Sequence, residues 1–254
     1  MATHYAEDFT AEVVALYKKQ LAAIREVRLS TRTPGISHQH ILSHATYSPW
    51  LDNAPFREAY ERIRRNTLVD VYRCFELWQL IERGQHVPGD VLEVGVWRGG
   101  TGGLMAKAAQ LFSPGSSVFL ADTFQGVVKA GEKDTNYKGG EHADTSVAIV
   151  EDLMRSLGVD NVRLLIGIYP EAIDPAVIGD RRIKLCHIDV DTYDSAKAIF
   201  EDVWPRLSPG GVVVFDDYGF WGCEGVTTLG NTLAPADGRF FHNVNGHAIF
   251  MKIA

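Results

Sequence analysis

The chain has few cysteines, no excess of positive charge and no long apolar run among its 254 residues. Its three cysteines, Cys74, Cys186 and Cys223, lie far apart and include no Cys-x-x-Cys pair, so we expect reduced core thiols in a cytoplasmic protein. No stretch reaches the roughly 18 apolar residues of a membrane helix. The first ten residues contain two acids and lack a basic segment followed by an apolar one, so no signal peptide is predicted.

The charge balance is acidic, with a net charge of -7 and a sequence pI near 5.7. Such a chain has no overall electrostatic attraction for nucleic acid or for an anionic membrane surface. We therefore predict neither as a partner and expect a small neutral or cationic molecule.

What the sequence does contain is enough apolar material for one α/β domain with a large core, since 46% of its residues are hydrophobic. Apolar residues recur at helical spacing over 9–27 and again over 55–82, while turn residues over 33–51 argue against regular structure. We predict a helical cap or oligomerisation region over residues 1–88 and a cofactor-binding catalytic domain over 89–254.

After Pro88, short apolar runs alternate with helical patterns. Strands are predicted at 91–96, 117–121, 162–167, 183–188, 211–215, 240–244 and 247–253, and helices at 101–112, 145–157 and 195–207. This alternation is typical of a doubly wound parallel sheet. Asn245-Gly246 separates the last two strands and is a hairpin signal, so the sheet should finish with an antiparallel edge.

A glycine loop follows the first of these strands, in the sequence VLEVGVWRGG at 91–100. Gly95 allows a tight turn, and the following helix offers free N–H groups to a carboxylate or phosphate. The spacing lacks the second glycine with which dinucleotide-binding loops approach a pyrophosphate, which disfavours an NAD-dependent oxidoreductase. Glu93 is placed for an ammonium group, so the loop suits S-adenosylmethionine, although a turn without a ligand is the alternative.

The next predicted strand ends in Asp122, which lies 27 positions after Gly95 (122 minus 95). That separation is close to the one at which such folds place an acid against a ribose diol. The alternative is that Asp122 caps a turn. Together, the loop and the acid favour a nucleoside-containing cofactor.

Four aspartates follow two further strands: Asp189 and Asp191 after 183–188, and Asp216 and Asp217 after 211–215. Open α/β sheets build their sites at the carboxyl ends of strands. Clustered carboxylates repel one another and raise each other's pKa unless a cation lies among them. Oxygen ligands alone predict Mg²⁺ or another hard divalent cation, although single aspartates also cap helices. A metal lowers the pKa of a bound hydroxyl, and a spare carboxylate can then accept its proton.

Four segments together resemble the macrocin O-methyltransferase family, which methylates deoxysugars on macrolides and other bacterial natural products. They are LEVGVWRGG at 92–100, ADTFQG at 121–126, DVDTY at 189–193, and LSPGG at 207–211 with DDY at 216–218. They occur in the family's order. The resemblance implies a Rossmann-like class I methyltransferase fold that uses S-adenosylmethionine.

The resemblance also implies roles for individual residues. It assigns cofactor binding to Glu93, Gly95 and Asp122, and extends the cofactor site to Thr67, Trp97, Arg98, Phe124, Gln125 and Gly167. It makes Asp189, Asp216 and Asp217 the Mg²⁺ ligands and Asp191 the general base.

Residues 127–145 correspond to a mobile lid in this family. Here the segment is rich in Gly and Lys and lacks the acidic, proline-containing pattern of macrolide enzymes. It is more similar to that of the calicheamicin-type rhamnosyl O-methyltransferases. His38, His40 and His44 form the only other cluster of metal-ligand type, but their spacing places them on no common helix face, so we predict a surface or substrate-lining segment.

We therefore predict a cytoplasmic, homo-oligomeric enzyme that methylates a sugar hydroxyl, of rhamnose type, on a glycosylated natural product. It would use S-adenosylmethionine and Mg²⁺. Two alternatives stay open: a catechol or phenolic O-methyltransferase with a similar metal site, and a non-catalytic protein that binds S-adenosylmethionine.

Overall fold

The computed structural model of the chain divides into two compact units, Met1–Ser48 and Pro49–Ala254. It describes residues 11–25, 27–29, 33–39, 47–243 and 246–254. The smaller unit contains helix α1 (Ala11–Arg25) and a short antiparallel pair, β1 (Arg28–Leu29) and β2 (His38–Gln39). The helix at 11–25 agrees with the predicted one. Strand β2 and the turn of 3-10 helix η1 (Pro49–Leu51) correct the prediction of irregular structure over 33–51.

The larger unit is built on a seven-stranded sheet with the order β5-β4-β3-β6-β7-β9-β8. Its strands are β3 (Asp90–Val94), β4 (Val118–Asp122), β5 (Val162–Ile166), β6 (Ile183–Ile188), β7 (Leu207–Phe215), β8 (Gly238–Asn243) and β9 (His247–Lys252). Strands β3 to β7 pair in parallel, whereas β9 runs antiparallel to both β7 and β8. The predicted parallel sheet with an antiparallel edge is confirmed.

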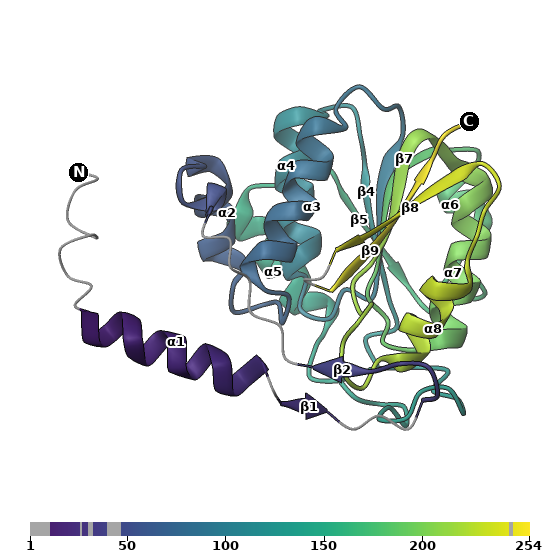
Figure 1. The fold of residues 1–254 in the computed structure, drawn as a ribbon. Helices are drawn as coiled ribbons and strands as arrows, with labels where there is room; N and C mark the ends of the chain where they lie inside the picture. Colours follow the sequence, from purple (N-terminus) through teal and green to yellow (C-terminus); the bar gives the residue numbers. More distant parts are fainter. Residues whose placement is uncertain (1–10, 26, 30–32, 40–46, 244–245) are drawn as a thin grey trace. The chain divides into compact units, whose positions relative to one another are not determined.

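Helices cover both faces of this sheet (Figure 1). One layer holds α2 (Ala54–Ile63), α3 (Val71–Arg83), α4 (Gly100–Phe112) and α5 (Val147–Leu157), and the other holds α6 (Pro175–Ile178), α7 (Tyr193–Val203), 3-10 helix η2 (Trp204–Arg206) and α8 (Glu224–Thr232). Successive strand residues point to opposite layers: Val91 and Leu120 join the first core, while Leu92 and Phe119 join the second. Strands that are buried on both faces have nearly continuous apolar sequences, as the central strands of this sheet do.

The helical pattern over 55–82 is two helices rather than one. Asp70 ends the break between them, because its carboxylate accepts hydrogen bonds from the N–H groups of Tyr72 and Arg73 and so caps α3. Thr67 lies in the break, where its hydroxyl accepts from the N–H of Val69. The break matters because residues 66–69 within it line the pocket described below.

The larger unit begins well before the boundary predicted at residue 88. Helices α2 and α3 pack against α4, and α2 also packs against α5, so both belong to the sheet's first helical layer. Phe56 and Trp78 are fully buried there and meet edge to face, with ring centroids 5.7 Å apart. In the described part of the chain, no helix combines the length and hydropathy needed to cross a bilayer.

Candidate active site

A pocket of about 310 Å³ opens where β3, β4, β6 and β7 end. Most of the predicted site residues line it: Thr67, Gly95, Trp97, Asp122, Gly167, Asp189, Asp191, Asp216 and Asp217. Four do not: Glu93, Arg98, Phe124 and Gln125. All the lining residues come from the larger unit.

Gly95 is required by the close approach of two strand ends. Its φ is +89°, and a Cβ there would lie 1.6 Å from the carbonyl oxygen of Asp189. No other residue fits this position without moving the loop after β6. The turn thus places the glycine loop directly beside the aspartate cluster.

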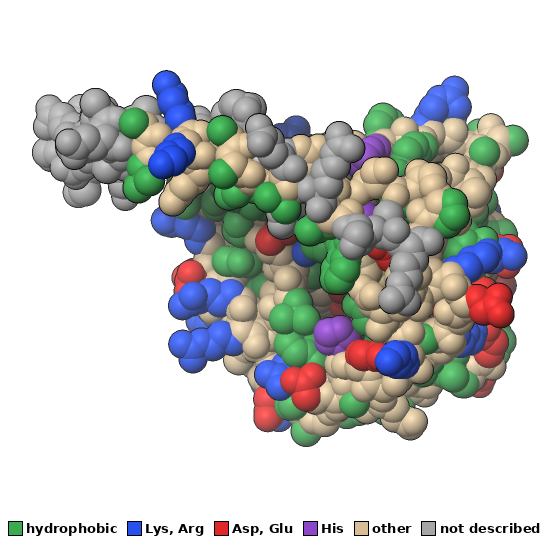
Figure 2. Space-filling model, turned by 60° about the horizontal axis from the view of Figure 1, so that its bottom comes forward, with side chains coloured by type: hydrophobic (Ala, Val, Ile, Leu, Met, Phe, Trp, Pro, Cys, Tyr) green, Lys and Arg blue, Asp and Glu red, His purple; other side chains and the backbone are tan. Residues whose placement is uncertain are grey.

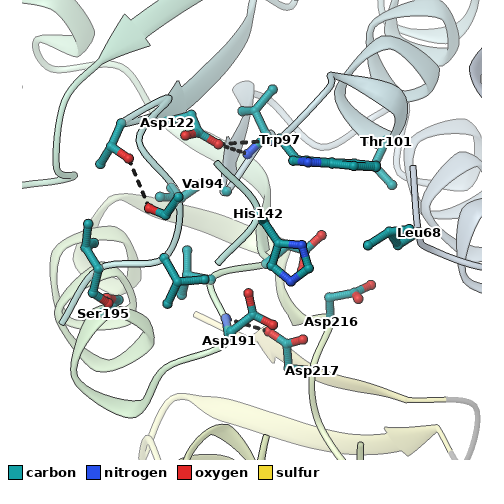
Figure 3. A pocket seen from close by; sticks show the side chains of 18 of the residues that line it. Leu68, Val94, Trp97, Thr101, Asp122, His142, Asp191, Ser195, Asp216 and Asp217 are labelled. Atoms are coloured by element: carbon teal, nitrogen blue, oxygen red, sulfur yellow. Dashed lines mark hydrogen bonds between the residues drawn. The ribbon is translucent and has the colours of Figure 1, made fainter. Parts of the chain in front are cut away.

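Asp122 organises the loops at the ends of β3 and β4 (Figure 3). Its Oδ2 accepts hydrogen bonds from the N–H groups of Val96 and Trp97 at 2.7 and 2.9 Å, and its Oδ1 accepts from Phe124 N–H at 2.6 Å. A carboxylate has about four lone-pair sites, so capacity is left for a ligand hydroxyl. Trp97 and Phe124 both have positive φ, which these bonds help to hold.

Arg98 faces away from the pocket and fixes residues 127–145 instead. Its guanidinium donates to the Asp144 carboxylate at 2.7 Å and lies over the Trp97 ring at 4.8 Å. The Trp97 indole N–H also donates to Asp144, at 2.8 Å. The side chain of Gln125 is exposed, and Phe124 packs against the core. These three residues lie outside the pocket lining, so their role in cofactor binding stays a prediction.

Glu93 also lies outside the pocket lining, so its role in cofactor binding stays a prediction. Its side chain is fully buried inside β3, and its Oε1 accepts from Nδ1 of His187 at 2.9 Å. Its Oε2 lies under α4, where a Cβ on Gly102 would come within 2.5 Å of it, and has no hydrogen-bond partner. Glu93 supports the site through His187 and does not line the pocket.

The strand ends bring Asp189, Asp216 and Asp217 together, with one carboxylate oxygen of each within 4.8 Å of the others. Burial raises the pKa of Asp189 well above its usual value, and the charges of Asp216 and Asp217 add to the effect. Burial likewise raises the pKa of Asp217, helped by the neighbouring charges of Asp191 and Asp216.

Asp216 differs from its neighbours because its carboxylate already has three hydrogen-bonding partners. Its Oδ1 accepts from Nε2 of His187 and His247 at 3.3 and 3.0 Å, and its Oδ2 pairs with Arg73. Burial alone would raise its pKa, but these hydrogen bonds and the Arg73 charge lower it. The same bonds outweigh the effect of burial on His187 and raise its pKa to about 10.

The donor set fits a hard divalent cation. All the strand-end donors are carboxylate oxygens. Burial, and after it repulsion between the carboxylates, raises the pKa values of Asp189 and Asp217, and a bound cation would relieve that repulsion. Asp216 is a weaker candidate ligand, because its carboxylate already pairs with Arg73 and with the imidazoles of His187 and His247. Asp189 and Asp217 are therefore the stronger candidate ligands.

Asp191 lies beside Asp217 in the pocket lining. Its φ is +63°, and its N–H donates to Oδ2 of Asp217 at 2.9 Å (Figure 3). Tyr137 hydrogen-bonds its carboxylate, and the Cys223 sulfur lies 3.9 Å from its Oδ1. Burial raises the pKa of Asp191, and His142 faces it from residues 127–145. Sequence reasoning missed Arg73, Tyr137 and Cys223, since no spacing links them to the strand ends.

The histidine cluster lies outside the pocket lining as far as it can be followed. His38 belongs to β2, and His40 and His44 lie outside the described residues. Their role as a surface or substrate-lining segment stays a prediction.

Comparison with protein families places this geometry in context. The family described as macrocin O-methyltransferase (TylF) matches residues 50–229. The chain belongs to this family. Every residue that lines the pocket falls within the matched range.

Two relatives come from antibiotic-producing bacteria. The chain is 31% identical over 171 residues to 8-demethyl-8-(2,3-dimethoxy-alpha-L-rhamnosyl)-tetracenomycin-C 4'-O-methyltransferase of Streptomyces olivaceus, covering 63% of the chain and 65% of the relative. It is 30% identical over 181 residues to mycinamicin III 3''-O-methyltransferase of Micromonospora griseorubida, covering 63% of the chain and 67% of the relative. The match thus spans about two thirds of each relative's length.

Among solved structures, the calicheamicin methyltransferase CalS11 has the same fold as this chain. It superposes with a TM-score of 0.61 at 20% identity, over 79% of this chain and 93% of that one. The predicted family and class I methyltransferase fold are confirmed.

Proposed function

We propose that this protein is an S-adenosylmethionine-dependent O-methyltransferase that requires a divalent metal and methylates a sugar hydroxyl, of rhamnose type, in the biosynthesis of a glycosylated natural product. The observation that carries the proposal is the pocket itself. A glycine loop suited to the cofactor and an all-carboxylate cluster meet in it at one edge of the sheet. The rhamnosyl acceptor named for the Streptomyces relative supports the sugar class.

The cofactor end of the pocket is assigned to residues around the glycine loop. Asp122 would accept from the ribose hydroxyls with its remaining lone pairs, and Gly95 leaves room for the methionine part. Thr67, Trp97 and Gly167 line the same pocket and complete the assignment. Arg98 acts at a distance by holding Trp97 and residues 127–145.

The acceptor end is assigned to the aspartates. A bound Mg²⁺, held by Asp189 and Asp217 with Asp216 beside them, would lower the pKa of the acceptor hydroxyl. Asp191 accepts the hydroxyl proton, while the hydroxyl oxygen forms the new bond to the methyl carbon. The electron pair of the broken carbon–sulfur bond stays on sulfur and leaves a neutral thioether.

Residues 127–145 shape the environment of the base. The Tyr137 hydrogen bond fixes the orientation of the Asp191 carboxylate, and the nearby ring of His142 helps to keep water away from it. Tyr137 is therefore a positioning residue for the base.

The test is methyl transfer by purified protein to a panel of rhamnosides and catechols, with Mg²⁺ or with EDTA. We expect turnover of rhamnosides, its loss in EDTA and its recovery on adding Mg²⁺, while calorimetry records S-adenosylhomocysteine binding throughout. Full activity in EDTA would remove the metal from the proposal. Turnover of catechols alone would replace the sugar by a phenol. Binding of the cofactor product without any turnover would favour a non-catalytic role.

A further inference from the structure

We propose that His142 binds the acceptor: its imidazole N–H donates a hydrogen bond to the sugar oxygen next to the hydroxyl that is methylated. This inference rests on the proposed function and adds a residue that selects and orients the acceptor. Three features of the structure carry it. They are the place of the ring, the backbone that holds it, and its unused hydrogen-bonding groups.

The His142 ring lies between the glycine loop and the aspartates. It lines the pocket, and its centroid is 6.4 Å from that of Trp97 and 6.3 Å from that of Tyr137. Figure 3 shows the ring in the middle of the pocket, between Trp97 and Asp191. Asp191 is the proposed acceptor of the hydroxyl proton. A hydroxyl that meets Asp191 therefore brings the neighbouring substituents of its sugar ring toward His142.

The surroundings of the ring are those of a ligand site rather than of a protein core. His142 is exposed although it lines a pocket. Figure 2 shows the face on which the strands end, where histidine, acidic and hydrophobic side chains lie close together. Apolar walls with a few well-placed polar groups are typical of a small-molecule site. The imidazole is thus accessible to an acceptor that enters the pocket.

The backbone at His142 has a conformation that few side chains adopt. Its φ is +61°, in the left-handed region, and such residues cluster at functional sites where their surroundings hold them in place. Hydrogen bonds hold the chain on both sides of His142. The Glu141 carbonyl accepts from the N–H of Val127 at 2.8 Å, and the Asp144 carboxylate accepts from the Trp97 indole at 2.8 Å. The ring is therefore presented to the pocket by a fixed segment of backbone.

The hydrogen-bonding groups of His142 are unused, whereas those of its neighbours are not. In the described part of the chain, no residue is hydrogen-bonded to the His142 nitrogens. A neutral imidazole has one N–H group and a charged one has two, so the ring is a donor in either state. Other donors of the lining already have acceptors in the protein: the Trp97 indole, the hydroxyls of Thr123, Tyr137 and Ser195, and the Arg73 guanidinium.

The aspartates of the pocket cannot fill this role. Ionised carboxylates, such as those that hold the proposed Mg²⁺, accept hydrogen bonds but do not donate them. His142 supplies a donor for the lone pair of a second sugar oxygen. A sugar held at Asp191 through one hydroxyl and at His142 through the next oxygen has a defined orientation toward the methyl group, which raises the rate. His142 therefore favours a sugar with an oxygen beside the reacting hydroxyl over one that is deoxygenated there.

The experiment crosses variants of His142 with analogues of the acceptor. The full chain, with Mg²⁺ and S-adenosylmethionine, methylates phenyl α-L-rhamnopyranoside, and NMR of the product identifies the methylated position. The probes are the monodeoxy analogues that lack an oxygen next to that position. On the parent rhamnoside, His142→Phe should lower kcat/KM roughly three- to tenfold, as for the loss of one neutral hydrogen bond. His142→Gln should lose less, because its amide N–H can donate.

The deciding comparison is between substrates. On one of the deoxy analogues, kcat/KM of the wild-type chain should fall by a similar factor, and His142→Phe should cause no further loss. The affinity for S-adenosylhomocysteine, measured by calorimetry, should be unchanged in both variants. His86→Phe is the matched control, because His86 is exposed and lies outside the pocket lining.

Two results would overturn the inference while leaving the proposed function standing. One is a kcat/KM of His142→Phe on the parent rhamnoside equal to that of the wild-type chain. The other is an equal loss in His142→Phe on the parent and on every deoxy analogue, which would make His142 a base or a packing residue. If the wild-type chain turns over no rhamnoside at all, the proposed function fails, and this inference with it.

Discussion

Asp189 and Asp191 lie two residues apart but have different partners. Asp189 lies among the carboxylates of Asp216 and Asp217. The Asp191 carboxylate instead accepts a hydrogen bond from Tyr137, and the Asp191 N–H donates to Asp217. The first environment favours a cation, and the second leaves a carboxylate free to accept a proton. Substitution should therefore separate the two roles.

Asp191→Asn keeps the shape of the side chain but removes the proton acceptor. We expect the catalytic rate to fall by roughly 10² to 10⁴, with the Mg²⁺ dependence unchanged. Asp189→Asn should instead shift the Mg²⁺ titration to higher concentration. Initial rates across a Mg²⁺ titration measure both effects. Near-normal turnover of Asp191→Asn would move the base elsewhere, with His142 the next candidate in the pocket.

Asp122→Ala should weaken S-adenosylhomocysteine binding at least tenfold. The change removes the acceptor of the Val96 and Trp97 N–H groups and the proposed partner of the ribose, with each hydrogen bond to the charged group contributing about 1.5 to 3 kcal/mol. Calorimetry measures the loss. Asp174→Ala is a control, because Asp174 caps the distant helix α6 through the N–H of Ala176. Unchanged affinity of Asp122→Ala would exclude Asp122 from the cofactor site.

The sequence predicted the positions of candidate site residues at strand ends better than those of residues inside strands or on distant elements. Asp189, Asp216 and Asp217 meet because parallel strands end at one edge, as expected. Glu93 sits two residues before Gly95, inside the strand, so its side chain lies under α4 rather than at the edge. Arg73 reaches the cluster from a helix more than 100 residues earlier (216 minus 73 is 143), and no local pattern reveals such a contact.

At the scale of elements, the longer helices were predicted, but α8 was missed. Helix α8 has the sequence EGVTTLGNT, with two glycines and three threonines in nine residues, which have poor helix propensity. The threonine hydroxyls bond back along the helix, as from Thr228 to the carbonyl of Glu224 at 2.7 Å. Burial of Val226 and Leu229 stabilises it instead, and tertiary contacts of this kind cannot be read from a local pattern.

Residues 127–145 were predicted as a mobile lid, and the structure reveals where they are anchored. Asp134 is buried and accepts from the N–H groups of Tyr193 and Gly131, both at 2.9 Å. At the far end, Asp144 binds Trp97 and Arg98. Between these anchors, Tyr137 reaches the pocket.

Hydrogen exchange tests how far the segment moves. We expect the amides around Asp134 to be protected already in the free protein, and those of residues 135–143 to gain protection with cofactor and rhamnoside. Asp134→Ala should abolish the first protection and lower the catalytic rate, because Tyr137 would lose its fixed position beside Asp191. Equal, slow exchange throughout the free segment would identify a fixed wall rather than a lid.

At the scale of the molecule, all residues of the pocket lie in the larger unit. The role of residues 1–88 as a helical cap or oligomerisation region stays a prediction. Helix α1 exposes Leu16, Tyr17 and Ile24. The boundary at residue 88 was predicted because short apolar runs begin to alternate with helical patterns after it. The structural division at Ser48 follows packing instead, because α2 and α3 cover the sheet.

The buried carboxylates couple the stability of the molecule to pH and, if the proposed metal binds them, to Mg²⁺ as well. The pKa values of Asp189 and Asp217 are raised by burial and by neighbouring carboxylates, so the folded protein binds their protons more tightly than the unfolded chain does. Stability from these groups is present at low pH and is lost as pH rises through the raised pKa values. Asp216 has a lowered pKa, so its contribution is present above the ordinary aspartate value of about 4 and is lost only as pH falls further.

Metal-free protein should therefore melt at a lower temperature at about pH 8 than at about pH 6. The raised pKa values of His187 (about 10), Asp189 and Asp217 all make the stability fall as pH rises, whereas Asp216 contributes equally at both values. Mg²⁺ competes with protons for Asp189 and Asp217, so its stabilising effect should be larger at the higher pH. Thermal unfolding at the two pH values, with Mg²⁺ or EDTA, measures the difference. Asp189→Asn should raise the metal-free melting temperature at about pH 8 and remove most of the Mg²⁺ effect, since it deletes one of the repelling charges. An equal gain from Mg²⁺ at both pH values, undiminished in Asp189→Asn, would show that the ion binds elsewhere.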